Sequence, residues 1–500
     1  MRRTAPIISL AASLVAGAVV VFSCTDPLQP PTLAPPHGPS AAAAPTGTAL
    51  QGSWTTPTTW PIVAAHLAVL PDGRVMTWVS SDQPGDVERH EVHVWDPATG
   101  AFTDLTAGVH NAFCAAEVFL ADGRLLVAGG HIADNKGLKQ AATFDWRMNA
   151  WQSTASMRAG RWYPTATMLV SGEVAIVAGS DENAAGNNYP EVWNGTSWRE
   201  LPGAPLAMPY YPWMHSAPDG RVFNSGPDQV TRFLNPSAGG AWTLGPRSNG
   251  GYREYGGSVM YAPGKILIMG GGDPPTNSAE TIDLNTAGGW QPTGSMAFAR
   301  RQMNSTVLPN GQVLALGGTS GTGFNDESRA VLPAEVWNPA TGAWTTLASI
   351  QVPRLYHSSA VLLPDARVLF AGGGRCGACT VDHFDAHIFS PPYLFSDDAT
   401  PAVRPQILAA PAQVSYGQAF TVQTSSALGI ARVTWVRLPA TTHSFNQNQW
   451  FNELSFTAAA GALTVTAPAT AYQAPPGHYM LFVLTSSGVP STAKWVHVGP

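Results

Sequence analysis

A repeated hairpin pattern constrains the fold of this 500-residue chain more than any other feature. Seven stretches consist of an apolar strand, a tight turn, a second apolar strand and small residues rich in glycine, as in VFLADGRLLVAGG and TVLPNGQVLALGG. The Asp-Gly and Asn-Gly turns supply the positive φ angles that a tight reversal needs. A unit that recurs about every 50 residues predicts one four-stranded blade of a β-propeller. The turn positions lie 44 to 55 residues apart, at Gly73, Gly123, Gly172, Gly220, Gly264, Gly311 and Ala366.

The end of the repeat region shows how the ring closes. Most repeats end in a Trp-bearing strand, such as EVWNGTSWREL, but the seventh ends at AHIFSPPYL without one. The missing strand stands at Gly52 to Pro57, at the other end of the region. We therefore predict a seven-bladed kelch-type β-propeller over residues 52–398, in which the N-terminal strand completes the last blade and removes an exposed edge.

Residues 399–500 lack the repeat and contain short alternating strands such as AFTVQTSS and RVTWVRL. This pattern is typical of an immunoglobulin-like β-sandwich. The composition agrees with an all-β fold, because Gly and Pro are abundant and only 12% of the residues are charged, against about 25% in typical chains. The net charge of −6 offers no basic surface for nucleic acid, so we expect no nucleic-acid partner.

The first 24 residues have the pattern of a signal peptide or lipoprotein leader. Arg2 and Arg3 precede an apolar run over 7–22, which is shorter than the roughly 20 residues of a membrane span. The run ends in VFSC, so lipidation of Cys24 is one alternative; ordinary cleavage and an uncleaved anchor are the others. Residues 25–51, rich in Pro, Ala and Thr, would form a flexible linker. We expect a secreted, periplasmic or cell-surface protein, whose leader offers the one means of membrane attachment.

Cys376 and Cys379 form a Cys-x-x-Cys pair followed by His383 and His387, a spacing that superficially suggests zinc. The histidines lie in an alternating, strand-like stretch in which four residues span about 13 Å. Two imidazoles that far apart cannot both reach one zinc ion at about 2 Å. A local disulfide in an oxidising compartment is the better interpretation.

Equivalent positions at the start of the inner strands should form a ring at one mouth of the propeller. Nine residues before the turn positions, most repeats have a thiol, phenol, amide or imidazole where a structural ring would have small or aliphatic side chains. Such mixed donors favour a redox-active metal, above all Cu(II). An aromatic funnel that binds a sugar or peptide is the alternative, since a slip of one residue would reverse the strand faces. The ring positions are Ala64, Cys114, Tyr163, Tyr211, Tyr255, Gln302 and His357.

Five separated motifs resemble those of the copper-radical oxidase family of galactose oxidase and glyoxal oxidase. They are FC at 113–114, RWYP at 161–164, PRLYHS at 353–358, TTHSFNQNQ at 441–449 and PPGHYMLFVLTSSGVPS at 475–491. The resemblance covers residues 52–500 and implies a galactose-oxidase-like (early-set) sandwich after the propeller. The pair Cys376 and Cys379 matches the local disulfide of this family.

The resemblance implies one copper ion and a radical cofactor. Tyr163 would be a copper ligand joined to Cys114 through a thioether, and His357 and His443 would be two further ligands. Tyr356 would be the axial ligand and the general base. The implied reaction is the two-electron oxidation of a small or glycan-linked aldehyde or primary alcohol, with O2 reduced to H2O2. The alternative is a non-catalytic kelch protein that binds carbohydrate or protein, and in both cases we expect a monomer.

Candidate substrate contacts are Tyr211, Tyr255, Gln302 and Asp181, although the same side chains could pack the funnel wall. Galactose oxidase has a Trp that stacks on its cross-linked tyrosine. Eighteen residues after Tyr163 this sequence has Asp181 instead, so no stacking ring is expected there. Four histidines match no ligand motif and are expected to be surface or packed residues: His110, His131, His215 and His478.

Overall fold

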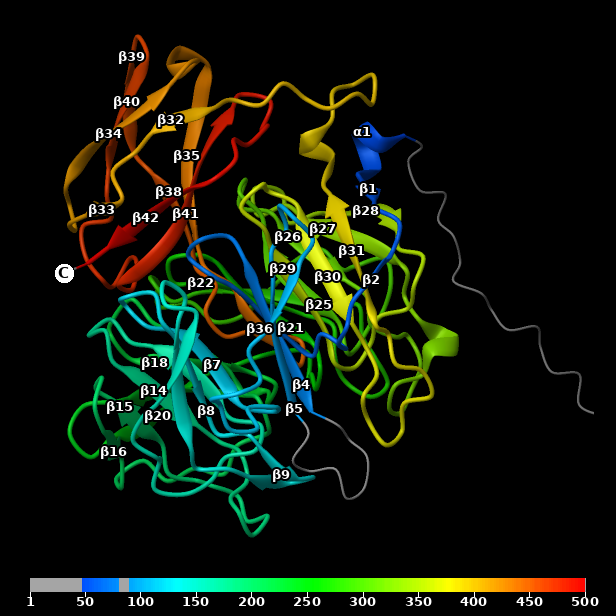
Figure 1. Ribbon diagram of the computed structural model, residues 1–500, viewed down its shortest axis with the longest axis vertical. Coiled ribbons are helices and arrows are strands. Elements are labelled where there is room, and N and C mark those ends of the chain that lie inside the picture. The colour runs from blue at the N-terminus through cyan, green and yellow to red at the C-terminus, as the bar shows by residue number, and fades with distance from the viewer. Residues whose placement is uncertain (1–46, 81–89, 500) are drawn as a thin grey trace, which may run out of the picture. The chain divides into compact units, whose positions relative to one another are not determined.

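The computed structural model describes residues 47–80 and 90–499 (Figure 1). The predicted leader with Cys24 and nearly all of the predicted linker lie outside the described residues. The described helices are short: α1 (Thr48–Gln51), η1 (Glu327–Arg329), η2 (Pro392–Leu394) and η3 (Ala427–Gly429). None of them is long and apolar enough to cross a membrane.

Seven antiparallel sheets correspond to the seven repeats. The first strands of neighbouring blades, such as β7 and β13, contact one another and are therefore the innermost strands. The first four blades contain β3 (His66–Val69), β4 (Val75–Ser80), β5 (His90–Trp95) and β6 (Phe102–Asp104); β7 (Ala116–Phe119), β8 (Leu125–Ala128), β11 (Ala141–Asp145) and β12 (Ala150–Ser153); β13 (Thr165–Met168), β14 (Val174–Val177), β15 (Glu191–Trp193) and β16 (Trp198–Glu200); and β17 (Trp213–Ser216), β18 (Val222–Gly226), β19 (Val230–Asn235) and β20 (Ala241–Arg247). The last three contain β21 (Gly257–Ala262), β22 (Lys265–Met269), β23 (Ala279–Asp283) and β24 (Gln291–Pro292); β25 (Asn304–Val307), β26 (Val313–Leu316), β27 (Pro333–Trp337) and β28 (Trp344–Ser349); and β29 (Ser358–Leu362), β30 (Val368–Gly372) and β31 (Asp385–Ser390). A small hairpin, β9 (His131–Ala133) and β10 (Lys136–Gly137), extends from blade two.

The N-terminal strand completes the seventh blade, as predicted. β1 (Ser53–Trp54) pairs with β31, with Ser53 opposite Ser390, and β2 (Thr58–Thr59) pairs with the same strand further along. Trp54 packs on Phe389, with ring centroids 4.8 Å apart, and its indole N–H donates to the Ala348 carbonyl of blade six at 2.9 Å. Residues from both ends of the repeat region thus close the ring, which confirms the predicted seven-bladed propeller.

The glycines that end each hairpin allow neighbouring blades to approach closely. Gly129, after β8, has φ of 88°, and a Cβ atom there would lie 2.4 Å from the carbonyl oxygen of Arg161 in the next blade. Gly317, after β26, has φ of 61°, and its Cβ would lie 2.4 Å from the carbonyl oxygen of Arg354 in the seventh blade. Only glycine combines a positive φ with this lack of space, so the repeated glycines follow from the ring geometry.

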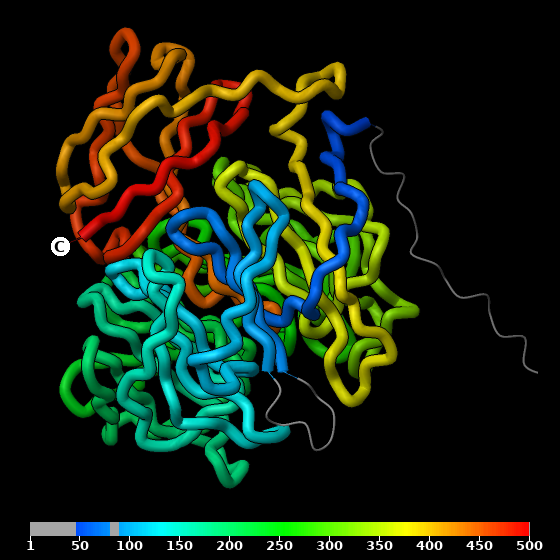
Figure 2. The backbone as a smooth tube through the Cα atoms, in the orientation of Figure 1, coloured from blue at the N-terminus to red at the C-terminus, as the bar shows by residue number. Residues whose placement is uncertain are grey.

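The C-terminal residues form the predicted β-sandwich, which is drawn in orange and red in Figure 2. The strand β34 (Ala419–Thr424) alternates between exposed and buried residues, as expected of a sheet with one solvated face. The strand β41 is buried along most of its length, because Met480 and Phe482 join the propeller core whereas Leu481 and Val483 join the sandwich core. The two sheets are β32 (Ile407–Ala409), β34 (Ala419–Thr424), β40 (Ala462–Thr466) and β39 (Phe456–Ala459), and β33 (Gln413–Val414), β42 (Lys494–Val498), β41 (Gly477–Thr485), β35 (Ile430–Arg437) and β38 (Phe451–Leu454).

A hairpin of β36 (Ala440–Thr442) and β37 (Phe445–Asn446) leaves the sandwich and joins the propeller. β36 pairs with the inner strand β3, with Thr442 opposite His66. The amide side chains that follow satisfy inner-strand N–H groups, since Gln447 accepts from Ala166 at 2.9 Å and Gln449 accepts from Val307 at 2.8 Å. The polar motif TTHSFNQNQ therefore fills the channel and bonds its walls.

Because Trp54 links the N-terminal strand to blades six and seven, Trp54→Ala should weaken ring closure. We expect a loss of about 2–4 kcal/mol in the free energy of unfolding and faster unfolding in denaturant. Trp344→Ala is the matched control, because Trp344 also donates its indole N–H to a neighbouring blade, at 2.7 Å, but stands on a strand that does not close the ring. Equal unfolding rates for the two variants would contradict the closure role of β1.

Candidate metal centre

The predicted ring positions share one backbone conformation. At six of them φ is between 44° and 65°, a left-handed conformation that costs a non-glycine residue about 1 kcal/mol or more. Main-chain bonds connect neighbours, since the Tyr163 N–H donates to the Cys114 carbonyl and the Tyr211 N–H to the Tyr163 carbonyl, both at 3.0 Å. Each residue stands just before an inner strand. The six are Cys114, Tyr163, Tyr211, Tyr255, Gln302 and His357.

Buried ion pairs support this ring from behind. Arg161, two residues before Tyr163, donates to the Ala178 carbonyl at 2.8 Å and to the Glu191 carboxylate at 2.9 Å. Because each guanidinium is both paired and hydrogen-bonded, its burial is compensated and the loop before the inner strand is fixed. The pairs Arg253–Glu280 (2.9 Å) and Arg300–Glu335 (2.5 Å) repeat the arrangement in blades five and six.

Two histidines present an unused nitrogen to the same space. The Nδ1–H of His357 donates to the Gly374 carbonyl at 2.8 Å. The Thr442 hydroxyl donates to the Ala65 carbonyl at 3.0 Å and therefore accepts from the Nδ1–H of His443 at 2.6 Å. Both imidazoles thus keep a lone pair on Nε2. Within residues 47–80 and 90–499, neither buried Nε2 atom has a hydrogen-bond partner.

Burial keeps these two imidazoles neutral. It lowers the pKa of His357 to about 4 and that of His443 well below its ordinary value. The two ring centroids lie 4.6 Å apart and the rings are nearly perpendicular. The pair can therefore donate two nitrogen lone pairs to one metal ion at any pH near neutrality.

Two buried phenols complete the group. The hydroxyls of Tyr163 and Tyr356 are hydrogen-bonded to each other. The Tyr163 ring lies 4.5 Å from that of His443, and the Tyr356 ring lies 3.9 Å from that of His357, between centroids. Burial raises the pKa of both phenols well above the ordinary value, and neighbouring ionisable groups add to the effect. Blade three, blade seven and the sandwich hairpin thus contribute to one cluster.

This cluster fits a copper ion. Buried nitrogen lone pairs without partners are unfavourable unless a ligand satisfies them. Two neutral imidazoles and two phenols, which a metal can bind as phenolates, form the mixed N,O donor set that suits Cu(II). In the described part of the chain, no three His, Cys, Asp or Glu side chains gather as a metal site, so the tyrosine-containing cluster is the candidate centre.

The zinc-like spacing near the seventh blade does not form a metal site. Cys376 and Cys379 are joined in a disulfide. His383 bonds to Glu327 at 3.1 Å, and His387 accepts from a buried arginine at 2.8 Å. Each of these side chains therefore has a partner other than a metal.

A tryptophan stacks on Tyr163, from a position other than that of Asp181, where no ring was expected. Trp162 lies over the Tyr163 ring at 3.6 Å between centroids, with 12° between the planes. Its indole N–H donates to Nδ1 of His131 at 3.2 Å. The stacking ring thus comes from the residue next to Tyr163 rather than from the loop after β14. His131 was expected to be a packed or surface residue, and it fixes this indole.

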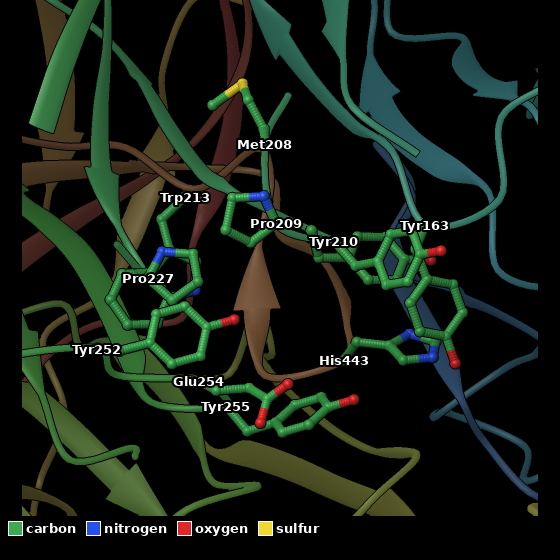
Figure 3. Close-up of a pocket in the computed structure, with 11 residues that line it drawn as sticks. Tyr163, Met208, Pro209, Tyr210, Trp213, Pro227, Tyr252, Glu254, Tyr255 and His443 are labelled. Atoms are coloured by element: carbon green, nitrogen blue, oxygen red, sulfur yellow. The ribbon is translucent and has the colours of Figure 1, made fainter. Parts of the chain in front are cut away.

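A pocket of about 220 Å³ opens beside the cluster. Figure 3 shows Tyr163 and His443 at one end and Trp213, Pro227 and Tyr252 at the other. Tyr211 and Tyr255, two predicted substrate contacts, line this pocket. Tyr210 lines it too, although the repeat register did not select this residue. The aromatic run PYYPW at 209–213 could have indicated a pocket wall here. The lining residues are Tyr163, Met208, Pro209, Tyr210, Tyr211, Trp213, Pro227, Tyr252, Glu254, Tyr255 and His443.

The other two predicted substrate contacts lie outside the lining of this pocket. Gln302 is buried, and its side-chain oxygen accepts from the Asn325 N–H at 3.3 Å. Asn325 in turn accepts from the Tyr356 N–H at 3.2 Å, so Gln302 supports the cluster from behind. Asp181 caps its own loop, since its carboxylate accepts from the N–H groups of Asn183 (2.8 Å) and Ala185 (3.0 Å).

Comparison with known proteins agrees with this geometry. The chain is 31% identical over 489 residues to the galactose oxidase of Gibberella zeae, covering 89% of this chain and 70% of the relative. The chain belongs to the copper-radical oxidase family. The oxidase is also 29% identical to the aldehyde oxidase GLOX of Vitis pseudoreticulata, covering 78% of this chain and 82% of the relative.

Family and structural matches cover both parts of the oxidase. Residues 276–389 match the glyoxal oxidase N-terminus family, and residues 404–498 match the galactose oxidase-like early set domain family. A solved fungal alcohol oxidase of the AA5 family, in complex with copper, matches with a TM-score of 0.82 at 28% identity, covering 90% of this chain and 100% of that one. The predicted all-β fold of propeller and early-set sandwich is confirmed.

The geometry separates the roles of Tyr210 and Asp181. Tyr210→Ala should raise KM about three- to tenfold, because it removes an aromatic wall of the pocket that meets Trp162 edge-on at 5.1 Å. Asp181→Asn keeps an acceptor for the loop N–H groups and should change kcat/KM less than about twofold. Steady-state oxidase assays test both variants. A rise in KM for Asp181→Asn that equals the rise for Tyr210→Ala would restore Asp181 as a substrate contact.

Proposed function

We propose that this oxidase is an extracytoplasmic copper enzyme that oxidises a small, neutral aldehyde or primary alcohol by two electrons and reduces O2 to H2O2. The observation that carries the proposal is the convergence of two unpartnered Nε2 atoms and two buried phenols beside an open pocket. Tyr163, Tyr356, His357 and His443 would hold the copper. The copper-bound fungal relative and the galactose and aldehyde oxidases named above support this function.

Each residue of the cluster has a chemical task. Bound copper would supply a one-electron acceptor and a Lewis acid for the substrate oxygen. Tyr356 would accept the proton of the substrate hydroxyl, which an aldehyde presents as its hydrate, as general base. Tyr163 would take the hydrogen atom from the carbon that carries this oxygen, and Trp162 would cover one face of its ring. Tyr163 and His443 line the pocket, so a substrate bound there would lie beside both rings.

The proposed radical cofactor is a thioether between Cys114 and Tyr163. Both residues are buried, occupy equivalent positions in adjacent blades and are joined by a main-chain hydrogen bond of 3.0 Å. A sulfur substituent extends the π-system of the phenol and would make a ring radical easier to form. The stacked indole of Trp162 would shield this radical from water.

The pocket favours a neutral substrate. Its walls are mainly aromatic, and none of the described lining residues is Lys or Arg. Glu254 is the acidic residue of the lining, and it pairs at 2.9 Å with Arg301, which also binds Asp273 at 2.8 Å. One cation between two carboxylates leaves a net negative rim, which would repel a carboxylate-bearing aldehyde. Aromatic faces suit the C–H groups of a small aldehyde or sugar.

An oxidising compartment is part of the proposal. The disulfide between Cys376 and Cys379 supports it, because such bonds persist mainly outside the cytosol. The apolar leader pattern of residues 7–22 supports export as well.

Addition of copper in air should form the thioether and start peroxide release at the same time. The mass of the intact protein should fall by two hydrogens as the thioether forms, and Cys114→Ser should show neither the mass change nor substantial activity. A mass that stays unchanged while wild-type protein oxidises substrate would contradict the thioether.

A substrate panel tests the reaction class. Glyoxal, methylglyoxal, glycolaldehyde and galactose should be compared with the anionic glyoxylate by peroxide release from copper-loaded protein. At low salt, we expect glyoxylate to have the lowest kcat/KM of the five compounds. Glu254→Gln should reduce the difference in kcat/KM between glyoxylate and the neutral substrates. Cross-linked protein that oxidises none of these compounds would favour the carbohydrate- or protein-binding alternative.

Copper binding should release protons. Burial raises the pKa of Tyr163 and of Tyr356, so both are neutral phenols at pH 7 before the metal binds. Each phenol that binds as phenolate loses one proton, and copper Kd should fall about tenfold per pH unit for each such ligand. His357, whose pKa burial lowers to about 4, adds no proton above pH 6. Chelator competition at several pH values measures the slope, which Tyr356→Phe should reduce by one proton; an unchanged slope would exclude Tyr356 as a phenolate ligand.

A further inference from the structure

A buried pair, Glu117 and His66, lies behind Cys114 and has no part in the reaction described above. Both side chains are fully buried, and the Nδ1 atom of His66 lies 2.5 Å from a carboxylate oxygen of Glu117. Glu117 belongs to the inner strand β7 of blade two, and His66 begins the inner strand β3 of blade one. The pair therefore stands beside the channel, between two blades.

The pair differs from the other buried carboxylates around the ring. Glu191, Glu280 and Glu335 each face an arginine, whereas Glu117 faces a histidine whose pKa burial lowers well below its ordinary value. Burial of a carboxyl group against a neutral ring yields little stability compared with an apolar pair of the same size. Fold stability therefore does not explain why Glu117 and His66 are present. Their contacts with neighbouring residues explain it better.

His66 bonds directly to the main chain of Cys114. The Cys114 N–H donates to Nε2 of His66 at 3.1 Å, and the Cys114 carbonyl accepts from the Tyr163 N–H at 3.0 Å. The peptide groups on both sides of Cys114 are thus held while its φ is 62°, in the left-handed region. Because Nε2 accepts, the imidazole hydrogen stands on Nδ1 and is donated to Glu117.

A tryptophan holds the imidazole in the correct plane. Trp78 stacks on His66 with ring centroids 4.5 Å apart and 16° between the planes. The same indole donates its N–H to the Ala112 carbonyl at 3.0 Å. Residues 112–114 are therefore bound at two points by one rigid stack, and Glu117 decides which nitrogen of that stack is the acceptor.

We propose that Glu117 and His66 are positioning residues for the cross-link: Glu117 fixes the hydrogen on Nδ1, so that His66 accepts from Cys114 and holds its thiol beside Tyr163. Without an acceptor at Glu117 the hydrogen can move to Nε2. It would then face the Cys114 N–H, donor against donor, and the strained turn would lose its support. The inference rests on the proposed thioether between Cys114 and Tyr163.

Formation of the thioether removes two hydrogens from the protein. One hydrogen leaves the Cys114 sulfur, one leaves a ring carbon of Tyr163, and a sulfur–carbon bond forms between them. The two electrons and two protons pass to O2, which becomes H2O2. Bond formation of this kind depends steeply on geometry, and a displacement of about 1 Å can slow such a step about 100-fold.

The experiment compares two replacements of Glu117 in the full chain. Glu117→Gln keeps an oxygen that can accept from Nδ1–H, whereas Glu117→Leu removes the acceptor at similar size. After copper is added in air, intact mass measured over time gives the rate at which two hydrogens are lost. We expect Glu117→Gln to cross-link within about threefold of wild type and Glu117→Leu to be at least about tenfold slower. Bound copper, measured by metal analysis, should be equal in all three proteins.

Further variants separate positioning from general destabilisation. His66→Phe keeps a ring stacked on Trp78 but removes the acceptor, so it should cross-link as slowly as Glu117→Leu. It replaces Glu117→Leu in the comparison if that variant fails to fold. Glu280→Gln weakens a buried pair in blade five and should cross-link at the wild-type rate. Once fully cross-linked, Glu117→Leu should have the wild-type KM, because the pair acts on formation of the cofactor.

The outcomes are distinguishable. If wild-type protein loses two hydrogens and both Glu117→Leu and His66→Phe do so at the same rate, the positioning role is wrong and the thioether stands. If Glu117→Gln is as slow as Glu117→Leu, or Glu280→Gln is equally slow, the tautomer argument is wrong. If wild-type protein never loses two hydrogens, the proposed cofactor itself is wrong.

Discussion

The left-handed turn before each inner strand is the constraint on which the centre depends. Six ring residues adopt it, and main-chain hydrogen bonds such as Tyr163 N–H to the Cys114 carbonyl join them. A single non-glycine residue in this conformation is unfavourable. The closed ring, the glycines that end each hairpin and the buried arginine–glutamate pairs hold all six residues in place. Side chains that are about 50 residues apart in sequence thereby reach one mouth of the propeller.

The sequence repeat was sufficient to predict the blades, the closing strand and the ring positions, because a hairpin period and a counting rule survive changes in loop length. The counting rule was not sufficient for residues whose side-chain direction depends on the loops. Asp181 was selected by its distance from Tyr163, yet the loop after β14 turns its carboxylate onto its own main chain. Trp162 and Tyr210 flank ring residues, and their direction depends on the turn itself. The pair of His66 and Glu117 interrupts two apolar strands, a signal that could have been used.

Polar side chains in the channel connect the two folded parts. The hairpin that carries His443 adds a strand to blade one, and Gln447 and Gln449 accept N–H groups from inner strands that have no neighbour on that side. The side-chain oxygens of these amides all accept backbone N–H groups, which offsets the cost of burying them. The amide nitrogens of Asn446 and Gln447 have no partner among the described residues. The same contacts place the His443 imidazole within 4.6 Å of that of His357, between centroids.

This hairpin also connects the candidate metal centre to the sandwich. The propeller contributes Tyr163, Tyr356 and His357 to the cluster, and the hairpin from the sandwich contributes the second imidazole nitrogen through His443. A metal held by the proposed ligands would therefore connect segments more than 250 residues apart, from Tyr163 to His443. By linkage, the free energy of metal binding would add to the free energy that holds the sandwich hairpin in the propeller. Metal binding at the proposed centre would thus help to hold the sandwich hairpin in the propeller channel.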